Sequence, residues 1–134
     1  MSLIDLAYRD PVDVWLVFRN LPAASKHSRL WKILMPGFEH VEVWKEVRAL
    51  WVRIEPCLEY VGTEIHEQPP WELVLPELRP TFLRVQRSVR MGHWREPWHI
   101  GPITCVELTK AIIGIRAPFI RTPWQLYKRL VKCS

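Results

Sequence analysis

The sequence lacks the patterns typical of secretion or membrane insertion. Its first residues, MSLIDLAYRDPVDVW, contain acidic side chains and have neither a basic start nor an apolar core, so they do not resemble a signal peptide. No apolar run approaches the roughly 20 residues that a membrane-spanning helix needs. We therefore expect a soluble protein that is cytoplasmic at synthesis.

Cysteine is scarce, and the three cysteines have no spacing typical of a metal site or a disulfide framework. Cys57, Cys105 and Cys133 are an odd number and contain no C-x-x-C pair. The histidines and cysteines show no ligand spacing for a metal. GxSxG, HExxH and P-loop patterns are also missing. The expectations are a reducing compartment, no metal and no cofactor.

Apolar and basic side chains are plentiful. The 134 residues predict a single domain, 1–134, and 49% hydrophobic with 25% charged residues is ordinary for a globular protein. The net charge of +5 permits contact with nucleic acid, anionic lipid or an acidic wall polymer. The cations gather loosely at 84–90 and at the C-terminal end, where a solvated basic face is the simpler explanation. Eight tryptophans can fill a small core or line a cleft.

Hydrophobic periodicity predicts an α+β fold, with an antiparallel sheet and helices gathered toward one side. Strands are expected at 12–19, 38–47, 49–56, 57–68 and 81–90, and the second and third of these form a hairpin. Helices are expected at 25–35, 104–115 and 122–132, with one or two helical turns at 69–78. The helix at 122–132 is expected to have Thr122 as its cap and Pro123 at its first helical position. Within 38–47, alternation places Phe38, His40, Glu42 and Trp44 on one face.

Cys105 is the residue whose position most suggests reactivity. It follows a Gly-Pro turn and falls in the first turn of the helix expected at 104–115. There the helix dipole and unpaired backbone N–H groups favour thiolate over thiol, and the same N–H groups can hold an oxyanion. The alternative is a cysteine that packs as a small hydrophobe, which is the commoner fate of a cysteine.

A thiol nucleophile needs an imidazole within hydrogen-bond reach, and five histidines compete for that role. His40 opens a strand after a Pro-Gly turn, a rigid position that suits a base facing a helix N-terminus. His27 is expected on a surface helix and His66 at the end of a weak strand. His93 and His99 lie in the turn-rich loop before the cysteine and fit a cleft wall better than a base.

Three segments, FEHVEVW, LWVRIEP and ITCVELTKAIIGIRAPFIRTPWQLYKRL, together resemble the circularly permuted branch of the NlpC-like papain superfamily. That branch includes lecithin:retinol acyltransferase-like proteins and several phage and bacterial proteins, and its strand histidine precedes its cysteine. The family pattern C-x-E-L is matched from Cys105 to Leu108, and T-P-x-x-L-Y from Thr122 to Tyr127. The resemblance covers 36–56 and 100–132 and leaves 57–99 unaligned.

The resemblance implies a circularly permuted papain-like fold and a thiol hydrolase or acyltransferase. Its substrate would be an amide or ester bond, in a peptidoglycan peptide or a lipid acyl group. Cys105 would be the nucleophile and His40 its base, with a polar residue one strand later to orient the imidazole. Glu55 matches that third position best and Glu42 is the alternative, although either carboxylate can equally be a surface charge paired with lysine or arginine.

The loop before the cysteine supplies the candidate substrate-binding residues. Trp94, Trp98 and His99 either form one wall of the cleft or pack within the protein. A phage-encoded or virion-associated protein would reconcile a wall substrate with cytoplasmic synthesis. The alternative function is a catalytically inactive papain-like module that serves in binding or in phage structure. Specific nucleic-acid binding is not expected, because no recognition motif is present and the basic residues are scattered.

Overall fold

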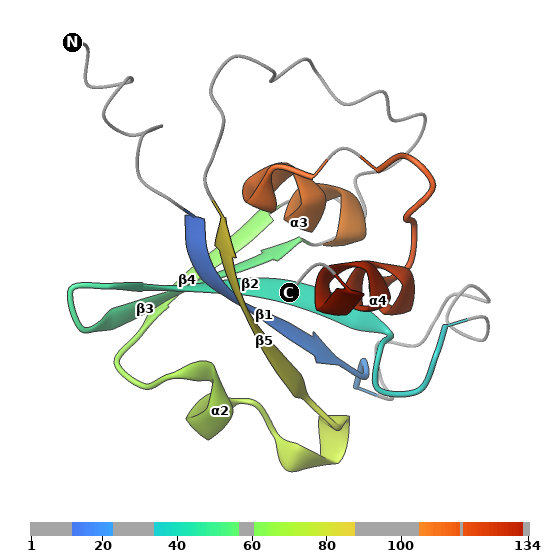
Figure 1. Cartoon of the computed structure of the whole chain (residues 1–134). Coiled ribbons are helices and arrows are strands. Elements are labelled where there is room, and N and C mark those ends of the chain that lie inside the picture. The colour runs from blue at the N-terminus through green and yellow to red at the C-terminus, as the bar shows by residue number, and fades with distance from the viewer. Residues whose placement is uncertain (1–11, 23–33, 57–60, 88–104, 116, 133–134) are drawn as a thin grey trace, which may run out of the picture.

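The computed structural model describes residues 12–22, 34–56, 61–87, 105–115 and 117–132. These residues form an antiparallel sheet with two helices over one face (Figure 1). The strands are β1 (Val12–Arg19), β2 (His40–Val47), β3 (Leu50–Pro56), β4 (Val61–His66) and β5 (Thr81–Arg87), in the spatial order β4-β3-β2-β1-β5. The predicted α+β class is confirmed, and β2 is the central strand.

The helical elements follow the sequence prediction closely. They are α2 (Pro70–Leu73), the 3-10 turn η3 (Pro76–Leu78), α3 (Cys105–Ile113) and α4 (Pro123–Lys132). The helix expected at 25–35 lies almost wholly outside the described residues. Within the described part of the chain, no helix is both long and apolar enough to cross a membrane.

The main core lies between the sheet and the helices α3 and α4. Alternation along β1 and β2 sends their valine, leucine and phenylalanine side chains toward the helices, whose apolar stripes close over them. Each large side chain buried in this way contributes about 1.5–3 kcal/mol. The buried members are Val14, Leu16, Phe18, Val41, Val43, Val85, Val106, Ile113, Leu126 and Leu130.

The opposite face of the sheet carries aromatic and charged side chains. Val17, Trp44 and Trp51 are buried there, and Trp71 of α2 packs edge-on to Trp51 and Trp15 at 5.4 and 5.2 Å between ring centroids. This short helical segment therefore covers part of the second face, so the helices are not all on one side.

The alternation predicted that Phe38 and His40 share a face, but in the structure they do not. The strand begins at His40, so Phe38 precedes it and escapes the two-residue period. Its ring instead joins the core on the helical side, 5.6 Å from Phe18 and 4.9 Å from Tyr127.

The start of α4 has the cap that the sequence predicted. The Gln125 backbone N–H donates to the Thr122 hydroxyl at 3.3 Å, and the Gln125 side-chain oxygen accepts from the Thr122 N–H at 3.2 Å. Pro123 occupies the first helical position, where its missing N–H costs nothing. This reciprocal arrangement fixes where the helix begins.

The β2–β3 hairpin turns on two residues with left-handed backbone. Val47 pairs with Leu50, so Arg48 and Ala49 form the loop, with φ of 49° and 66°. Two-residue hairpin loops of this hand favour Asn-Gly, because a Cβ is strained at positive φ. The positive φ angles of Arg48 and Ala49 therefore lower the stability of the hairpin.

Candidate functional site

The structure brings Cys105 and His40 together, although they are far apart in the sequence. Each is the first residue of its element, α3 and β2, and α3 packs over β2. The Cys105 thiol is half-buried and hydrogen-bonds the His40 side chain. The thiol and the imidazole thus meet at the ends of two rigid elements.

The chain entering β2 is tied down on both sides, which fixes the direction of His40. Gly37 adopts a φ of 83° in the turn, and its N–H donates to the Asn20 side-chain oxygen. The Glu39 N–H then donates to the Arg19 carbonyl at 3.1 Å, and Arg19 pairs with His40 in the β1–β2 register. The Pro-Gly turn noted in the sequence is therefore the element that aims the histidine.

The surroundings of Cys105 favour the thiolate. Burial raises the pKa of the thiol, but its hydrogen bond to His40, the imidazolium charge, and the backbone N–H groups of Val41 and Val106 together lower the pKa below its ordinary value. Helix N-terminal N–H groups act in the same direction. The thiol is therefore poised to ionise at lower pH than a free cysteine.

His40 carries the matching positive charge. Burial lowers the pKa of His40, but its contacts with Cys105 and with Glu55 outweigh burial and raise the pKa to about 9. The Nε2 atom of His40 lies 3.3 Å from a Glu55 carboxylate oxygen. This contact is an ion pair whose geometry is not that of a hydrogen bond. These opposite pKa shifts of Cys105 and His40 both favour a thiolate–imidazolium pair.

Glu55 is held ionised beside the imidazole. The contact with His40 lowers its pKa most, burial opposes this, and Arg53 and Arg19 lower it further, to about 2. Both arginines lie 2.9 Å from a Glu55 carboxylate oxygen. The carboxylate can thus orient His40 and stabilise its charge, as third residues of triads do.

Glu42, the alternative third residue, fills a different place. Its side chain is fully buried, so it is not a surface charge, and its nearest oxygen lies 3.9 Å from His40 Nε2. Arg53 donates to it at 2.7 and 3.0 Å and the Trp44 indole N–H at 3.0 Å. Glu42 therefore anchors the arginines, and Glu55 is the closer partner of the imidazole.

The same residues do not suit a metal ion. His40, Glu42 and Glu55 offer ligand atoms within 4.8 Å of one another. However, the guanidinium groups of Arg19 and Arg53 already lie on both carboxylates and would repel a cation. The donor set therefore fits a charge network rather than a metal centre.

The other residues singled out in the sequence are mostly not placed. Trp94, Trp98 and His99, like His27, His93, Cys57 and Cys133, lie outside the described residues. His66 is placed, and it lies away from the thiol: its ring stacks on Trp44 at 5.3 Å and contacts Glu64 at 2.9 Å. Within the described part of the chain, His40 is thus the histidine that meets Cys105.

The sequence prediction missed Arg19 and Arg53, which hold the carboxylates. Arg19 pairs with His40 across β1 and β2, and Arg53 alternates onto the face of Glu55. The alternation within each strand shows on which face of that strand an arginine lies. Only the register between strands shows that these arginines and the carboxylates share one face of the sheet.

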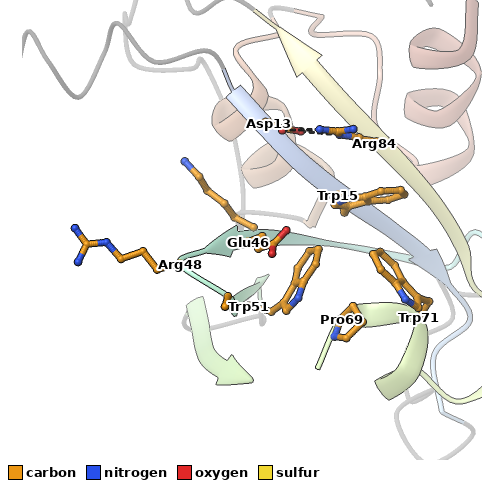
Figure 2. Close-up of a pocket in the computed structure, with 10 residues that line it drawn as sticks. Asp13, Trp15, Glu46, Arg48, Trp51, Pro69, Trp71 and Arg84 are labelled. Atoms are coloured by element: carbon orange, nitrogen blue, oxygen red, sulfur yellow. Dashed lines mark hydrogen bonds and ion pairs between the residues drawn. The ribbon is translucent and has the colours of Figure 1, made fainter. Parts of the chain in front are cut away.

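A groove lies apart from Cys105 and His40. It has a volume of about 810 Å³ and includes Trp15, Trp51 and Trp71, beside the ion pair of Arg84 with Asp13 (Figure 2). These tryptophans belong to the sheet face opposite the main core, whereas α3 covers the other face. None of Cys105, His40 and Glu55 lines the groove, which is therefore a separate feature of the surface.

No protein-family model, curated protein or solved structure matches the chain. The function proposed below rests on the geometry and chemistry of Cys105, His40 and Glu55.

Proposed function

We propose that the protein is a thiol hydrolase or acyltransferase of the circularly permuted NlpC-like papain type, acting on an amide or ester bond. One observation carries the proposal: a cysteine at a helix N-terminus hydrogen-bonds a strand histidine whose pKa is raised to about 9. Such pairing activates a thiol nucleophile.

The chain order and the architecture support the papain-like assignment. The histidine strand precedes the cysteine helix in sequence, the polar third residue lies on the neighbouring strand β3, and the helix packs over the central strand of an antiparallel sheet. The order of histidine and cysteine and the polar residue one strand later are features of the family that the sequence resembles.

The proposed reaction proceeds through a thioester. The Cys105 thiolate attacks the carbonyl carbon, and the new oxyanion accepts N–H hydrogen bonds at the start of α3, where the Val106 N–H already faces the sulfur. The carbon–nitrogen or carbon–oxygen bond breaks, and the leaving group takes the imidazolium proton of His40. Neutral His40 then deprotonates a water or another acceptor, which attacks the thioester and releases the acyl group, and the thiolate–imidazolium pair is restored.

The substrate class follows from the resemblance and the charge. A peptidoglycan peptide and a lipid acyl group are the two candidates, and the net charge of +5 suits the anionic surfaces on which either is found. The mechanism uses no cofactor. A phage-encoded or virion-associated protein would have access to the wall after synthesis in the cytoplasm.

An inactive binding or phage structural module is the second candidate. The groove at Trp15, Trp51 and Trp71 favours it, because this hollow is distinct from the thiol and is lined by aromatic side chains suited to a partner.

Trapping of the acyl-enzyme tests the proposal. The protein is incubated with muropeptides or with short-chain phospholipids, quenched in acid, digested and analysed by mass spectrometry. We expect the acyl mass on the peptide that contains Cys105, and none in Cys105→Ala. His66→Ala is the matched control for His40→Ala, because both histidines lie at strand ends and only His40 contacts the thiol. Turnover without the Cys105 adduct, or equal turnover in Cys105→Ala, would overturn the mechanism, and no turnover of any acyl substrate would leave the binding module in its place.

A further inference from the structure

Phe119 is held in water at the tip of a turn. It is 90% exposed, the highest fraction for a large apolar side chain among the residues that the structure describes. The Ile120 N–H donates to the Ala117 carbonyl at 3.1 Å, so 118 and 119 are the central residues of a closed turn. The turn lies in the connection between α3 and α4, on the outside of the helical layer (Figure 1).

A buried lysine fixes this turn from beneath. The Lys110 side chain is 5% exposed, and its ammonium donates to the Ala117 and Ile120 carbonyls, each at 2.8 Å, and contacts Glu107 at 2.8 Å. Burying an ammonium is costly unless it is fully hydrogen-bonded. The chain thus commits a buried charge to the turn that displays Phe119, so the exposure of the ring is part of the folded structure.

Four cations follow this turn, one just before α4 and three on the helix. We call Arg121, Lys128, Arg129 and Lys132 the basic stripe; all four are exposed. Pro123, Leu126 and Leu130 form the buried side of the helix. The sequence contains no Asp or Glu after residue 107, so the segment that carries the stripe has no carboxylate side chain of its own.

We propose that Phe119 and the basic stripe bind a membrane surface that contains anionic lipid. Exposed cations that closely follow an exposed aromatic side chain in the sequence have the composition of an interfacial binding surface, where cations contact headgroups and the ring enters the boundary with the acyl chains. A polyanion without aromatic groups would account for the cations alone, whereas burial of the exposed phenylalanine ring among acyl chains is favourable because it removes apolar surface from water. The proposal does not depend on the chemistry of Cys105.

Vesicle cosedimentation of the full chain tests this surface. Vesicles of phosphatidylcholine, with and without phosphatidylglycerol, are used at low and high salt. We expect binding only to the vesicles with phosphatidylglycerol, and weaker binding in salt because the charges are screened. Phe119→Ser abolishes the salt-resistant part, and Arg129→Gln with Lys132→Gln lowers the affinity about fivefold per cation.

Matched controls lie on other parts of the surface. Leu75→Ser removes an apolar side chain that is 59% exposed, and Lys45→Gln with Arg48→Gln removes two exposed cations of β2 and its turn, so both variants should bind as the unmodified protein does. Phe119→Trp should retain binding, and brominated lipid should quench the added fluorescence.

Two results would overturn the proposal. One is no binding to anionic vesicles. The other is that Phe119→Ser binds with the same affinity as the unmodified protein, whether to vesicles, to single-stranded DNA or to wall teichoic acid. That result would make the basic stripe a polyanion site. Cys105→Ala should bind vesicles normally, so failure of the hydrolase proposal and failure of this one are separately visible.

Discussion

Removal of His40 should slow the alkylation of Cys105 most at low pH. In the folded protein, the imidazolium of His40, whose pKa is about 9, stabilises the Cys105 thiolate. His40→Ala takes away that charge and leaves the N–H groups of Val41 and Val106. The rate of reaction with iodoacetamide, a small uncharged electrophile, should therefore depend on pH in different ways in the two proteins.

The magnitude follows from the ionised fraction. A free cysteine with a pKa of about 8.5 is roughly 0.3% thiolate at pH 6, whereas a thiolate paired with an imidazolium is largely ionised, so removal of the imidazolium lowers that fraction by up to about 300-fold. Intrinsic nucleophilicity rises with basicity with a coefficient of about 0.4–0.5, which recovers roughly half of the loss on a logarithmic scale. A net fall of up to about 20-fold at pH 6 is expected.

The assay follows the carbamidomethylated Cys105 peptide by mass spectrometry from pH 5.5 to 9.5, in a background of Cys57→Ser and Cys133→Ser. In the protein that retains Cys105 and His40 (the unmodified dyad), the alkylation rate should be nearly constant from pH 6 to 8. In His40→Ala, the rate should rise with pH. His66→Ala is the control, and it should match the unmodified dyad. Identical profiles for His40→Ala and the unmodified dyad would refute the thiolate–imidazolium pair.

The carboxylates and the hairpin give three more expectations. The folded pKa of Glu55 is about 2 against an ordinary 4.5, so its contribution to stability is complete above pH 4.5 and is lost as the pH falls toward 2. Glu55→Gln should therefore remove up to about 3 kcal/mol of the acid dependence of the unfolding free energy. Urea unfolding at pH 7 and at pH 3 measures this difference. Glu42→Gln should destabilise by about 3 kcal/mol in the same assay, because it leaves the buried Arg19 and the partly buried Arg53 short of a charge, whereas Glu64→Gln at the exposed edge should cost under about 1 kcal/mol. Arg48→Asn with Ala49→Gly should raise the free energy of unfolding by about 1 kcal/mol, measured by thermal denaturation, and an unchanged Tm would show that the left-handed loop is not strained.

Much of the fold was predictable because its signals are local. Alternation marked the strands, and Thr122 followed by Pro123 marked the start of α4, since the cap depends only on neighbouring residues. The encounter of Cys105 with His40 was predicted from chemistry, because a helix start and a strand start are both rigid places for reacting groups.

The charge network could not be predicted, because it is built by the sheet as a whole. Glu42 looks like a surface carboxylate in the sequence, yet it is fully buried, since Arg19 from β1 and Arg53 from β3 converge on it. Which strands become neighbours decides that convergence, and no local pattern states it. The predicted face of Phe38 was wrong for a related reason. A strand boundary one or two residues away reverses the side on which a residue lies.

The dyad has a consequence for the life of the polypeptide before it folds. His40 and Cys105 belong to separate elements that meet only when α3 has docked on β2. A nascent or unfolded chain therefore carries an ordinary, mostly protonated thiol, which reacts slowly with electrophiles and oxidants. Under the proposed mechanism, folding itself creates the activated thiol, so the unfolded chain is inactive.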